Sequence, residues 1–350
     1  MKEKNKKILK NLLIVIICIF CCSCSIHFNL SPFDNYDYYD SNLKYIEEEN
    51  KRLEEEKAKK EAELKKKIES RNYIDERLNG YFGLLNNNER QIYYDIYENA
   101  NNFNNDFFDL TYRVSIERLQ NIFRSVVYDN PDLFWLKTYW YYKDQDTKEV
   151  YSVMLIYYDR KPEEESSENI VDFVKEKNKV AIEENQIKKE QFNIVVNNIV
   201  NIANNYNSVL EKEKYVHDYL VNSITYDENM HSDQSPYGAL IYNKSVCAGY
   251  AKAFQLIMKK LNIPTFYISG EAWNEKGQSL HAWNLIQIDN EYYNIDVTWD
   301  DPINNYYGKN RIRYTYFNVS DEVISKNHLR GEFSTNLPSA LGTKYSNLYK

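Results

Sequence analysis

Two segments rich in β-branched and aromatic residues, 281–288 and 291–298, flank the dipeptide Asp289-Asn290, and this pattern constrains the fold most strongly. Because Asp and Asn tolerate positive φ, the dipeptide predicts a two-residue hairpin turn. That turn fixes the register, since Ile288 then pairs with Glu291 and every other pair follows. One face of the hairpin becomes apolar and consists of Ala282, Ile286, Ile288, Ile295 and Val297.

The opposite face of this hairpin carries polar groups. In the predicted register Trp283 faces Asp296 and His281 faces Thr298, so His281 and Asp296 are diagonal neighbours within side-chain reach. A three-residue loop without a bulge would instead place the two side chains on opposite faces. A further strand is predicted over 264–269 by its composition. The pattern therefore predicts a half-buried sheet with a candidate site on one face.

The N-terminus has the form of an export signal. The basic stretch 1–10 is followed by the apolar run 12–22, which is too short for a confident membrane-spanning helix. Ser23 followed by Cys24 resembles the bacterial lipobox, so residues 1–23 are predicted to be a signal peptide and Cys24 to carry lipid. Cys22 is the alternative lipidation site, and an uncleaved N-terminal anchor is the alternative to processing. Each of these predicts a cell-membrane protein that faces outside the cytoplasm.

The placement of the five cysteines is more informative than their number. Three of them lie within the predicted signal, and Cys24 is the expected lipid acceptor. Cys247 then remains as a single thiol with no disulfide partner in an exported chain. Such a thiol is either a small buried side chain or a reactive group.

A helix is predicted from residue 246, because apolar residues recur at positions 246, 250, 253, 254, 257 and 261. Ser245 is the expected N-cap residue, which places Cys247 in the first turn. There the free backbone N–H groups stabilise a thiolate and can hold a developing oxyanion. With His281 to take the thiol proton and Asp296 to orient the imidazole, this is the arrangement of thiol acyl transfer. A core cysteine, a half-buried histidine and a capping acid are the structural alternatives for the single residues.

The chain before this region is predicted to be mainly helical. Residues 24–70 read as a tether and a charged helix with Glu-first pairs four residues apart, among them Glu56/Lys60 and Glu63/Lys67. Apolar heptad positions are poorly filled, so a solvated spacer is favoured over a coiled coil, which would make an oligomer through residues 41–70. Residues 71–204 are predicted to form several helices over 71–128, a hairpin of 133–142 with 149–158, and a helical stretch over 163–204.

Charge and histidine spacing exclude other classes of function. The formal net charge of −8 gives no electrostatic support to a nucleic-acid partner. His217, His231 and His328 lack the spacing of metal ligands, and no second cysteine joins them. No metal and no cofactor are therefore expected, and His217 is expected to be structural.

Three blocks resemble, in order and spacing, the signatures of the transglutaminase-like superfamily: 246–251 (VCAGYA), 281–284 (HAWN) and 295–299 (IDVTW). The stretch 213–227 is similar to the helix that precedes the core, and 129–135 resembles an N-terminal region of exported bacterial members. The resemblance implies an α+β, papain-like core over 205–350, in which the helix with Cys247 packs on an antiparallel sheet with His281 and Asp296. A mainly helical region with a β-hairpin would precede this core.

The resemblance also implies roles for residues around these three. The family uses a side-chain donor upstream of the cysteine as a second oxyanion contact, and Tyr237 is the residue expected here, with a packed core tyrosine as the alternative. Trp283 and Trp299 are expected to wall the site, or else to pack in the core. Nothing in the sequence resembles the calcium sites of animal transglutaminases.

Two hypotheses follow for the function. The first is a surface-anchored thiol enzyme that performs acyl transfer or amide hydrolysis on peptides or proteins of the cell envelope. The alternative is a non-catalytic envelope binding module that retains the transglutaminase-like fold. A third interpretation, an oligomeric structural protein, rests only on the weak heptads of residues 41–70.

Overall fold

The computed structural model describes residues 36–159, 170–229, 234–275, 277–301 and 312–349, with side chains from residue 44 onward. The predicted signal peptide 1–23, the lipidation sites Cys24 and Cys22, and His231 lie outside the described residues. Contacts divide the chain into two units, Met1–Lys66 and Lys67–Lys350. Within the described part of the chain, no helix is both long enough and apolar enough to cross a bilayer.

Helix α2 (Tyr36–Glu69) is continuous, and most of its described side chains are exposed, as its charged composition predicts. The predicted pair of Glu56 and Lys60 forms, with 2.8 Å between carboxylate and ammonium. Lys67 instead binds Asp95, at 2.6 Å. The helix prediction for this segment is confirmed, whereas its role as a spacer or as an oligomerisation element stays a prediction.

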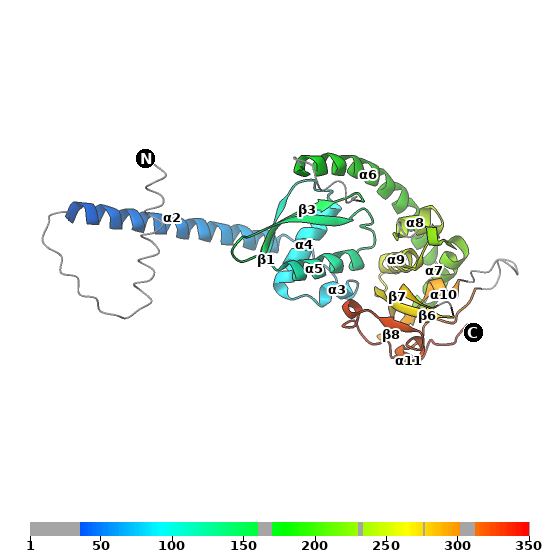
Figure 1. Cartoon of the computed structure of the whole chain (residues 1–350). Helices are drawn as coiled ribbons and strands as arrows, with labels where there is room; N and C mark the ends of the chain where they lie inside the picture. The colour runs from blue at the N-terminus through cyan, green and yellow to red at the C-terminus, as the bar shows by residue number, and fades with distance from the viewer. Residues whose placement is uncertain (1–35, 160–169, 230–233, 276, 302–311, 350) are drawn as a thin grey trace. The chain divides into compact units, whose positions relative to one another are not determined.

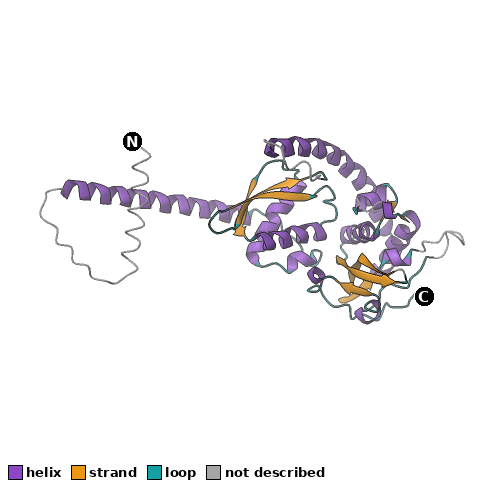
Figure 2. Cartoon of the chain, viewed as in Figure 1, coloured by secondary structure: helices purple, strands orange, loops and turns teal. Residues whose placement is uncertain are grey.

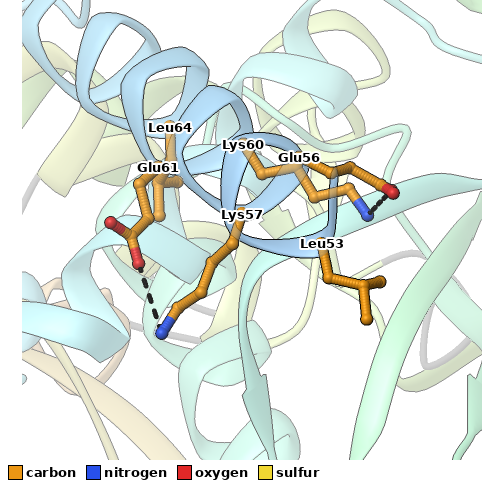
Figure 3. Close-up of a pocket in the computed structure, with 6 residues that line it drawn as sticks. All are labelled: Leu53, Glu56, Lys57, Lys60, Glu61 and Leu64. Atoms are coloured by element: carbon orange, nitrogen blue, oxygen red, sulfur yellow. Dashed lines mark ion pairs between the residues drawn. The ribbon is translucent and has the colours of Figure 1, made fainter. Parts of the chain in front are cut away.

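A shallow recess on α2 is lined by side chains of this one helix only (Figure 3). Two ion pairs lie beside it, Glu56 with Lys60 and Lys57 with Glu61, the second at 3.9 Å. Because all of its lining belongs to one exposed helix, the recess is ordinary helix surface, and we assign no function to it.

The first part of the second unit combines helices with a three-stranded antiparallel sheet (Figures 1 and 2). Asn86 begins one helix with a capping box that includes Glu89, and Ser115 caps the next helix. In the sheet the central strand pairs with both others, in the order β1-β3-β2. The elements are α3 (Gly80–Gly83), α4 (Asn87–Asn101), β1 (Phe108–Val114), α5 (Ile116–Asp129), β2 (Thr138–Lys143) and β3 (Val150–Ile156).

Strand β1 corrects the sequence prediction, which assigned all of 71–128 to helices. In Phe108–Val114 the apolar residues Phe108, Leu110, Tyr112 and Val114 alternate with polar ones, and this period of two is typical of a strand. The strand pairs with β3, which is part of the hairpin that was predicted. The predicted hairpin itself is confirmed, with β2 paired to β3.

Helices dominate the middle of the chain, and a short parallel pair of strands lies among them. Tyr226 on one strand pairs with Ser245 on the other. Ser208 caps one of the helices in a capping box with Glu211, and Ser235 caps another. The elements are α6 (Ile170–Ala203), α7 (Val209–Ser223), β4 (Thr225–Tyr226), α8 (Pro236–Ile241), β5 (Lys244–Ser245) and α9 (Cys247–Lys260).

The last part of the chain forms a four-stranded antiparallel sheet in the order β8-β7-β6-β9, and α9 packs against β6 and β7. Buried residues of α9 and of the neighbouring helices join the sheet in the largest apolar cluster. The predicted α+β class is thereby confirmed. The elements are β6 (Thr265–Asn274), β7 (Gly277–Ile288), β8 (Glu291–Ile295), α10 (Val297–Asp300), α11 (Asp321–Ile324), β9 (His328–Arg330) and the 3-10 turn Glu332–Ser334.

The hairpin of β7 and β8 has the predicted turn and register. Asp289 and Asn290 have φ values of 50° and 65°, and Ile288 pairs with Glu291. The pairing ends with Asn284 and Ile295, so the predicted second strand is too long. It ends there because the next residue, Asp296, turns the chain and becomes the N-cap of α10.

The helical region before residue 204 is joined to α9 by polar contacts. The ammonium of Lys259 on α9 donates to the carbonyl oxygen of Asp129, at 2.5 Å, and to Asn79, at 2.6 Å. The carboxylate of Asp129 accepts the backbone N–H groups of Tyr81 and Phe82, at 3.1 and 2.7 Å. Burial raises the pKa of Asp129 to about 6 even though the Lys259 charge opposes the rise. These contacts lie inside the unit Lys67–Lys350, and the boundary near residue 205 stays a prediction.

Candidate active site

Cys247 is the first residue of α9 and is partly exposed. The N-cap residue is Val246 and not Ser245, so that prediction is wrong by one position. Ser245 is held in extended backbone because it pairs with Tyr226 in the short β4–β5 ladder, and the helix therefore begins after it. The side chain of Val246 makes no capping hydrogen bond to the first turn of α9. The backbone N–H groups beside Cys247 can therefore bind a negative charge.

Gly249 permits this tight start of the helix. A Cβ at this position would collide with Ser245 Oγ and would lie 3.0 Å from the carbonyl oxygen of Ser235. Any larger residue would therefore push β5 or α8 away from α9. The glycine in the VCAGYA block thus fixes where Cys247 sits relative to its neighbouring strand.

His281 and Asp296 lie together, as the hairpin predicts. His281 Nε2 is 2.7 Å from Asp296 Oδ2, and both side chains are buried. The other carboxylate oxygen of Asp296, Oδ1, accepts the backbone N–H groups of Thr298 and Trp299, at 3.0 and 3.1 Å. Asp296 therefore caps α10 through Oδ1 and binds His281 through Oδ2, so both oxygens of its carboxylate are held in place.

Charge fixes the protonation of this pair. Burial alone would raise the pKa of Asp296, but the charge of His281 and the hydrogen bonds from His281 and His328 hold it well below its usual range. Burial alone would lower the pKa of His281, but Asp296, with a smaller contribution from Cys247, raises it to about 10. Because an ionised carboxylate only accepts hydrogen bonds, the nitrogen of His281 that faces it carries the proton.

The other ring nitrogen of His281 serves the thiol. The thiol of Cys247 lies close enough to His281 to help raise the pKa of that imidazole, and with Nε2 held by Asp296 the nitrogen left to face the thiol is Nδ1. Because Nε2 already carries a proton, Nδ1 is the nitrogen that takes a proton from the thiol, and the raised pKa of His281 favours the imidazolium that results. The structure therefore brings the three predicted residues Cys247, His281 and Asp296 together in one connected set.

A fourth residue, His328 on strand β9, joins this set, and sequence reasoning missed it. His328 Nε2 is 3.0 Å from the same oxygen, Asp296 Oδ2, and the side chain is fully buried. Nothing local in the sequence marks His328, because it reaches the site only through the pairing of β9 with β6 at Ala272.

His281, Asp296 and His328 are also the described residues that could hold a metal ion, since one ligand atom of each lies within 4.8 Å of the others. The two nitrogen–oxygen distances, 2.7 and 3.0 Å, are those of direct hydrogen bonds. In this structure the three side chains are therefore joined by hydrogen bonds from the two imidazoles to the carboxylate.

The two predicted wall residues differ. Trp283 is buried, donates through Nε1 to Asn294 at 3.2 Å, and belongs to an apolar core cluster. Trp299 is partly exposed, and its ring centroid lies 5.4 Å from that of His281. Both rings therefore lie beside His281, since the centroid of Trp283 is 6.2 Å from it, but Trp283 is also a buried core residue whereas Trp299 is partly exposed.

The described contacts of Tyr237 are those of core packing. Its hydroxyl lies 3.4 Å from Gln191 Oε1, and its ring packs against Phe134 and Phe192. These are the contacts of the packed core tyrosine that was the alternative. Its oxyanion role has no support from this packing.

Tyr226 on β4 interacts with the charge of the thiol. Burial raises its pKa to about 12, and the next contribution is the negative charge of Cys247. The sequence held a signal for it, since Tyr226 is in the stretch 213–227 that resembles the segment before the core. Tyr226 is therefore the better candidate for an upstream donor.

The helical region contributes a tyrosine to this neighbourhood. Tyr128 at the end of α5 packs edge-on to Tyr267 at 4.8 Å between ring centroids, and its hydroxyl donates to Ser269 Oγ at 3.1 Å. Tyr128 and Cys247 both pack against the small apolar cluster of Ala248, Ala251, Tyr267 and Ala282. This contribution from residues far upstream is not visible in the sequence pattern.

Comparison with known families supports the fold. The family model described as the transglutaminase-like superfamily matches residues 198–297, which include Cys247, His281 and Asp296. The predicted resemblance is confirmed, since this part of the chain is similar to the transglutaminase-like superfamily. His328 lies outside the matched segment.

Two solved structures are also similar to parts of the chain. One, from Cytophaga hutchinsonii and provisionally assigned as a cysteine protease, is 20% identical with a TM-score of 0.27, over 29% of this chain and 37% of its own. The other, described as a TGase, is 17% identical with a TM-score of 0.30, over 50% of this chain and 47% of its own. The chain thus spans less than half of either structure. No curated protein sequence matches the chain.

Proposed function

We propose that this protein is a thiol enzyme that transfers or hydrolyses acyl groups of peptide or protein amides. The observation that carries the proposal is the connected set of Cys247 at a helix N-terminus, His281 beside it and Asp296 behind His281. The match of residues 198–297 to the transglutaminase-like superfamily supports the same chemistry.

In the proposed reaction each of these residues has a role. His281 Nδ1 takes the proton of Cys247, and the thiolate attacks the carbonyl carbon of an amide to form a C–S bond. The N–H groups at the start of α9, with the Tyr226 hydroxyl, stabilise the negative oxygen of the tetrahedral intermediate. The imidazolium of His281 then returns its proton to the nitrogen of the leaving amine, and the C–N bond breaks to leave a thioester.

The second half of the reaction decides the class of enzyme. Attack on the thioester by water gives a carboxylic acid, and attack by an amine gives a new amide; in both cases His281 accepts the proton of the attacking group and returns it to the Cys247 thiol. Asp296 stays ionised throughout and holds the imidazole in the tautomer that this cycle needs.

We also propose that the enzyme is lipid-anchored through Cys24 and faces outside the cytoplasm. The support is the basic and apolar N-terminal sequence and the Ser23-Cys24 junction. Substrates of this enzyme would then be peptides or proteins of the cell envelope, and the charged helix α2 would hold the catalytic unit away from the membrane surface.

The test uses the full chain with a glutamine-containing peptide, with and without a fluorescent primary amine. Incorporation of the amine indicates transamidation, and release of ammonia without incorporation indicates hydrolysis. Cys247→Ala is expected to abolish both reactions, whereas Cys24→Ala, which removes the expected lipid acceptor only, is expected to keep them. Absence of turnover and of any trapped thioester on Cys247, together with envelope binding that survives Cys247→Ala, would favour the non-catalytic binding module instead.

A further inference from the structure

His328 stands out among the buried groups because it bonds to a carboxylate that already serves the site. Asp296 Oδ2 lies 2.7 Å from His281 Nε2 and 3.0 Å from His328 Nε2. Oδ1 of the same residue accepts two backbone N–H groups, those of Thr298 and Trp299. Four donors therefore fill the four lone-pair positions of one carboxylate.

We propose that His328 is a positioning residue for the reaction: its Nε2–H fixes Oδ2 of Asp296 and takes a share of that oxygen's charge, which limits how tightly Asp296 holds the imidazolium of His281. The inference rests on the proposed function of Cys247, His281 and Asp296. It assigns to His328 no contact with substrate.

The surroundings of His328 hold its ring in one orientation. Its Nδ1 is 2.8 Å from Asn327 Oδ1, and the Asn327 amide donates to the Tyr316 hydroxyl at 2.6 Å. The ring lies against Trp299, with 4.5 Å between centroids, and edge-on to Trp283, with 5.1 Å. A ring held on so many sides can define where Oδ2 lies, because Oδ2 has no backbone partner of its own in the contacts described.

The direction of the effect follows from the charge on Oδ2. An oxygen that loses one of its two donors becomes a stronger acceptor for the donor that remains. Without the His328 donor, Asp296 would bind the protonated form of His281 more tightly, and His281 would lose its proton at a higher pH. The proton that the leaving amine needs would then be released less readily from His281.

Other ionisable groups also face this pair and are unchanged by a substitution at His328. Cys247 approaches His281 from α9, and Tyr226 approaches from β4. Asp300 on α10 and Tyr316, in the segment that precedes α11, both interact with the charge of Asp296. Because they are common to all variants, a difference between variants reports on His328.

The test compares His328→Leu, which removes the donor, with His328→Gln, whose amide N–H can restore it. The measurement is the rate of alkylation of Cys247 by iodoacetamide as a function of pH on the full chain, with Cys247 resolved by peptide mass spectrometry. A thiolate paired with an imidazolium is less nucleophilic than a free one, so the rate rises a second time when His281 loses its proton. Leu329→Ala, an exposed neighbour on β9, serves as the matched control.

We expect His328→Leu to move the second rise upward by about one pH unit. His328→Gln and Leu329→Ala should keep it at the wild-type position. A second rise that stays in place in the leucine variant would overturn the inference, as would a glutamine variant that is shifted as far as the leucine variant. If wild-type Cys247 reacts no faster than free cysteine below neutral pH, the proposed function fails, whatever His328 does.

A measurement on the unmodified chain does not depend on whether the variants fold. Nitrogen-15 NMR of the five histidines distinguishes protonated from bare ring nitrogens. The proposal requires a proton on His328 Nε2 throughout the pH range in which the chain is folded. A bare Nε2 on His328, with the proton on Nδ1 alone, would overturn it.

Discussion

Two buried histidine–aspartate sites lie at the two ends of one short helix, α10, and only one of them has the parts of a catalyst. Asp296 caps the start of α10 and bonds to His281, whereas Asp300 ends it and lies 3.3 Å from His217 Nε2. The other nitrogen of His217, Nδ1, is 3.0 Å from Asp218. Both nitrogens of His217 therefore face carboxylates, whereas His281 keeps one nitrogen for Cys247.

The difference shows that a buried His–Asp pair does not by itself make a catalyst. Burial alone would lower the pKa of His217, but its hydrogen bonds with Asp218 and Asp300 raise it, which favours a cation between two acids. Its ring packs against Tyr314 and Phe317, and no nitrogen is left for a proton acceptor role. His217 has the contacts of a structural residue, which is the role the sequence predicts, whereas Nδ1 of His281 faces a partly exposed thiol.

The largest expected effect is a difference in reaction rate between variants of the two aspartates. Asp296→Asn is expected to lower the rate of amine incorporation or amide hydrolysis by about 10⁴-fold, because an amide can hold His281 in the wrong tautomer. Asp300→Asn is expected to lower it by less than about tenfold, since Asp300 bonds to the structural histidine. The measurement is the initial rate at fixed substrate, with folding of each variant checked by circular dichroism. Equal losses in both variants would remove the distinction between the two sites.

The free energy of unfolding is expected to depend on the two histidines in the opposite order, with His217 contributing more than His281. His217→Gln should lower the free energy of unfolding by about 3 kcal/mol, because Asp218 and Asp300 lose the cation between them. His281→Gln should change it by less than about 1 kcal/mol, because the glutamine amide can donate to Asp296. Urea unfolding of the full chain measures both values. The comparison fails if His281→Gln costs as much as His217→Gln.

A smaller effect concerns Glu213, which is buried on the same helix, α7, as His217. One oxygen of Glu213 accepts from Asn318 at 2.9 Å, and the other is buried with no hydrogen-bond partner in the described part of the chain. Burial raises its pKa to about 8, so its contribution to stability is complete below its ordinary pKa and is lost as the pH rises toward 8.

Glu213→Gln should remove this loss. Between pH 6 and pH 8 the free energy of unfolding of the wild type should fall by about 2 kcal/mol more than that of the variant, measured by urea unfolding at each pH. The raised pKa of His217 acts in the same direction but is present in both proteins. Parallel pH dependences in the two proteins would show that Glu213 is already ionised when buried.

The parts of the site that could be predicted are those set by local chemistry. Asp289 and Asn290 adopt the positive φ that a two-residue turn requires, and this turn fixes the register that brings β8 beside His281. The helix that carries Cys247 follows from its apolar spacing. The first residue of this helix could not be predicted, because the β4–β5 pairing is a tertiary contact and moves the N-cap from Ser245 to Val246.

The residues of the site that could not be predicted belong to segments that are distant in the sequence. His328 reaches Asp296 only because β9 adds to the edge of β6, and three residues of strand leave no periodic pattern to read. Tyr128 reaches the neighbourhood of Cys247 through the packing of α5 on β6. Strand β1 was missed for a different reason, since helical and strand periods compete in a short amphipathic segment and its pairing with β3 decides the outcome.

The central claim is that Cys247 is a nucleophile activated by His281, and site-resolved alkylation tests it most directly. The full chain is treated with iodoacetamide at about pH 6, and peptide mass spectrometry separates Cys247 from the four N-terminal cysteines. We predict that wild-type Cys247 reacts at least about tenfold faster than free cysteine and that His281→Gln removes this excess. Equal rates for Cys247 and free cysteine, unchanged by His281→Gln in a folded protein, would contradict the account.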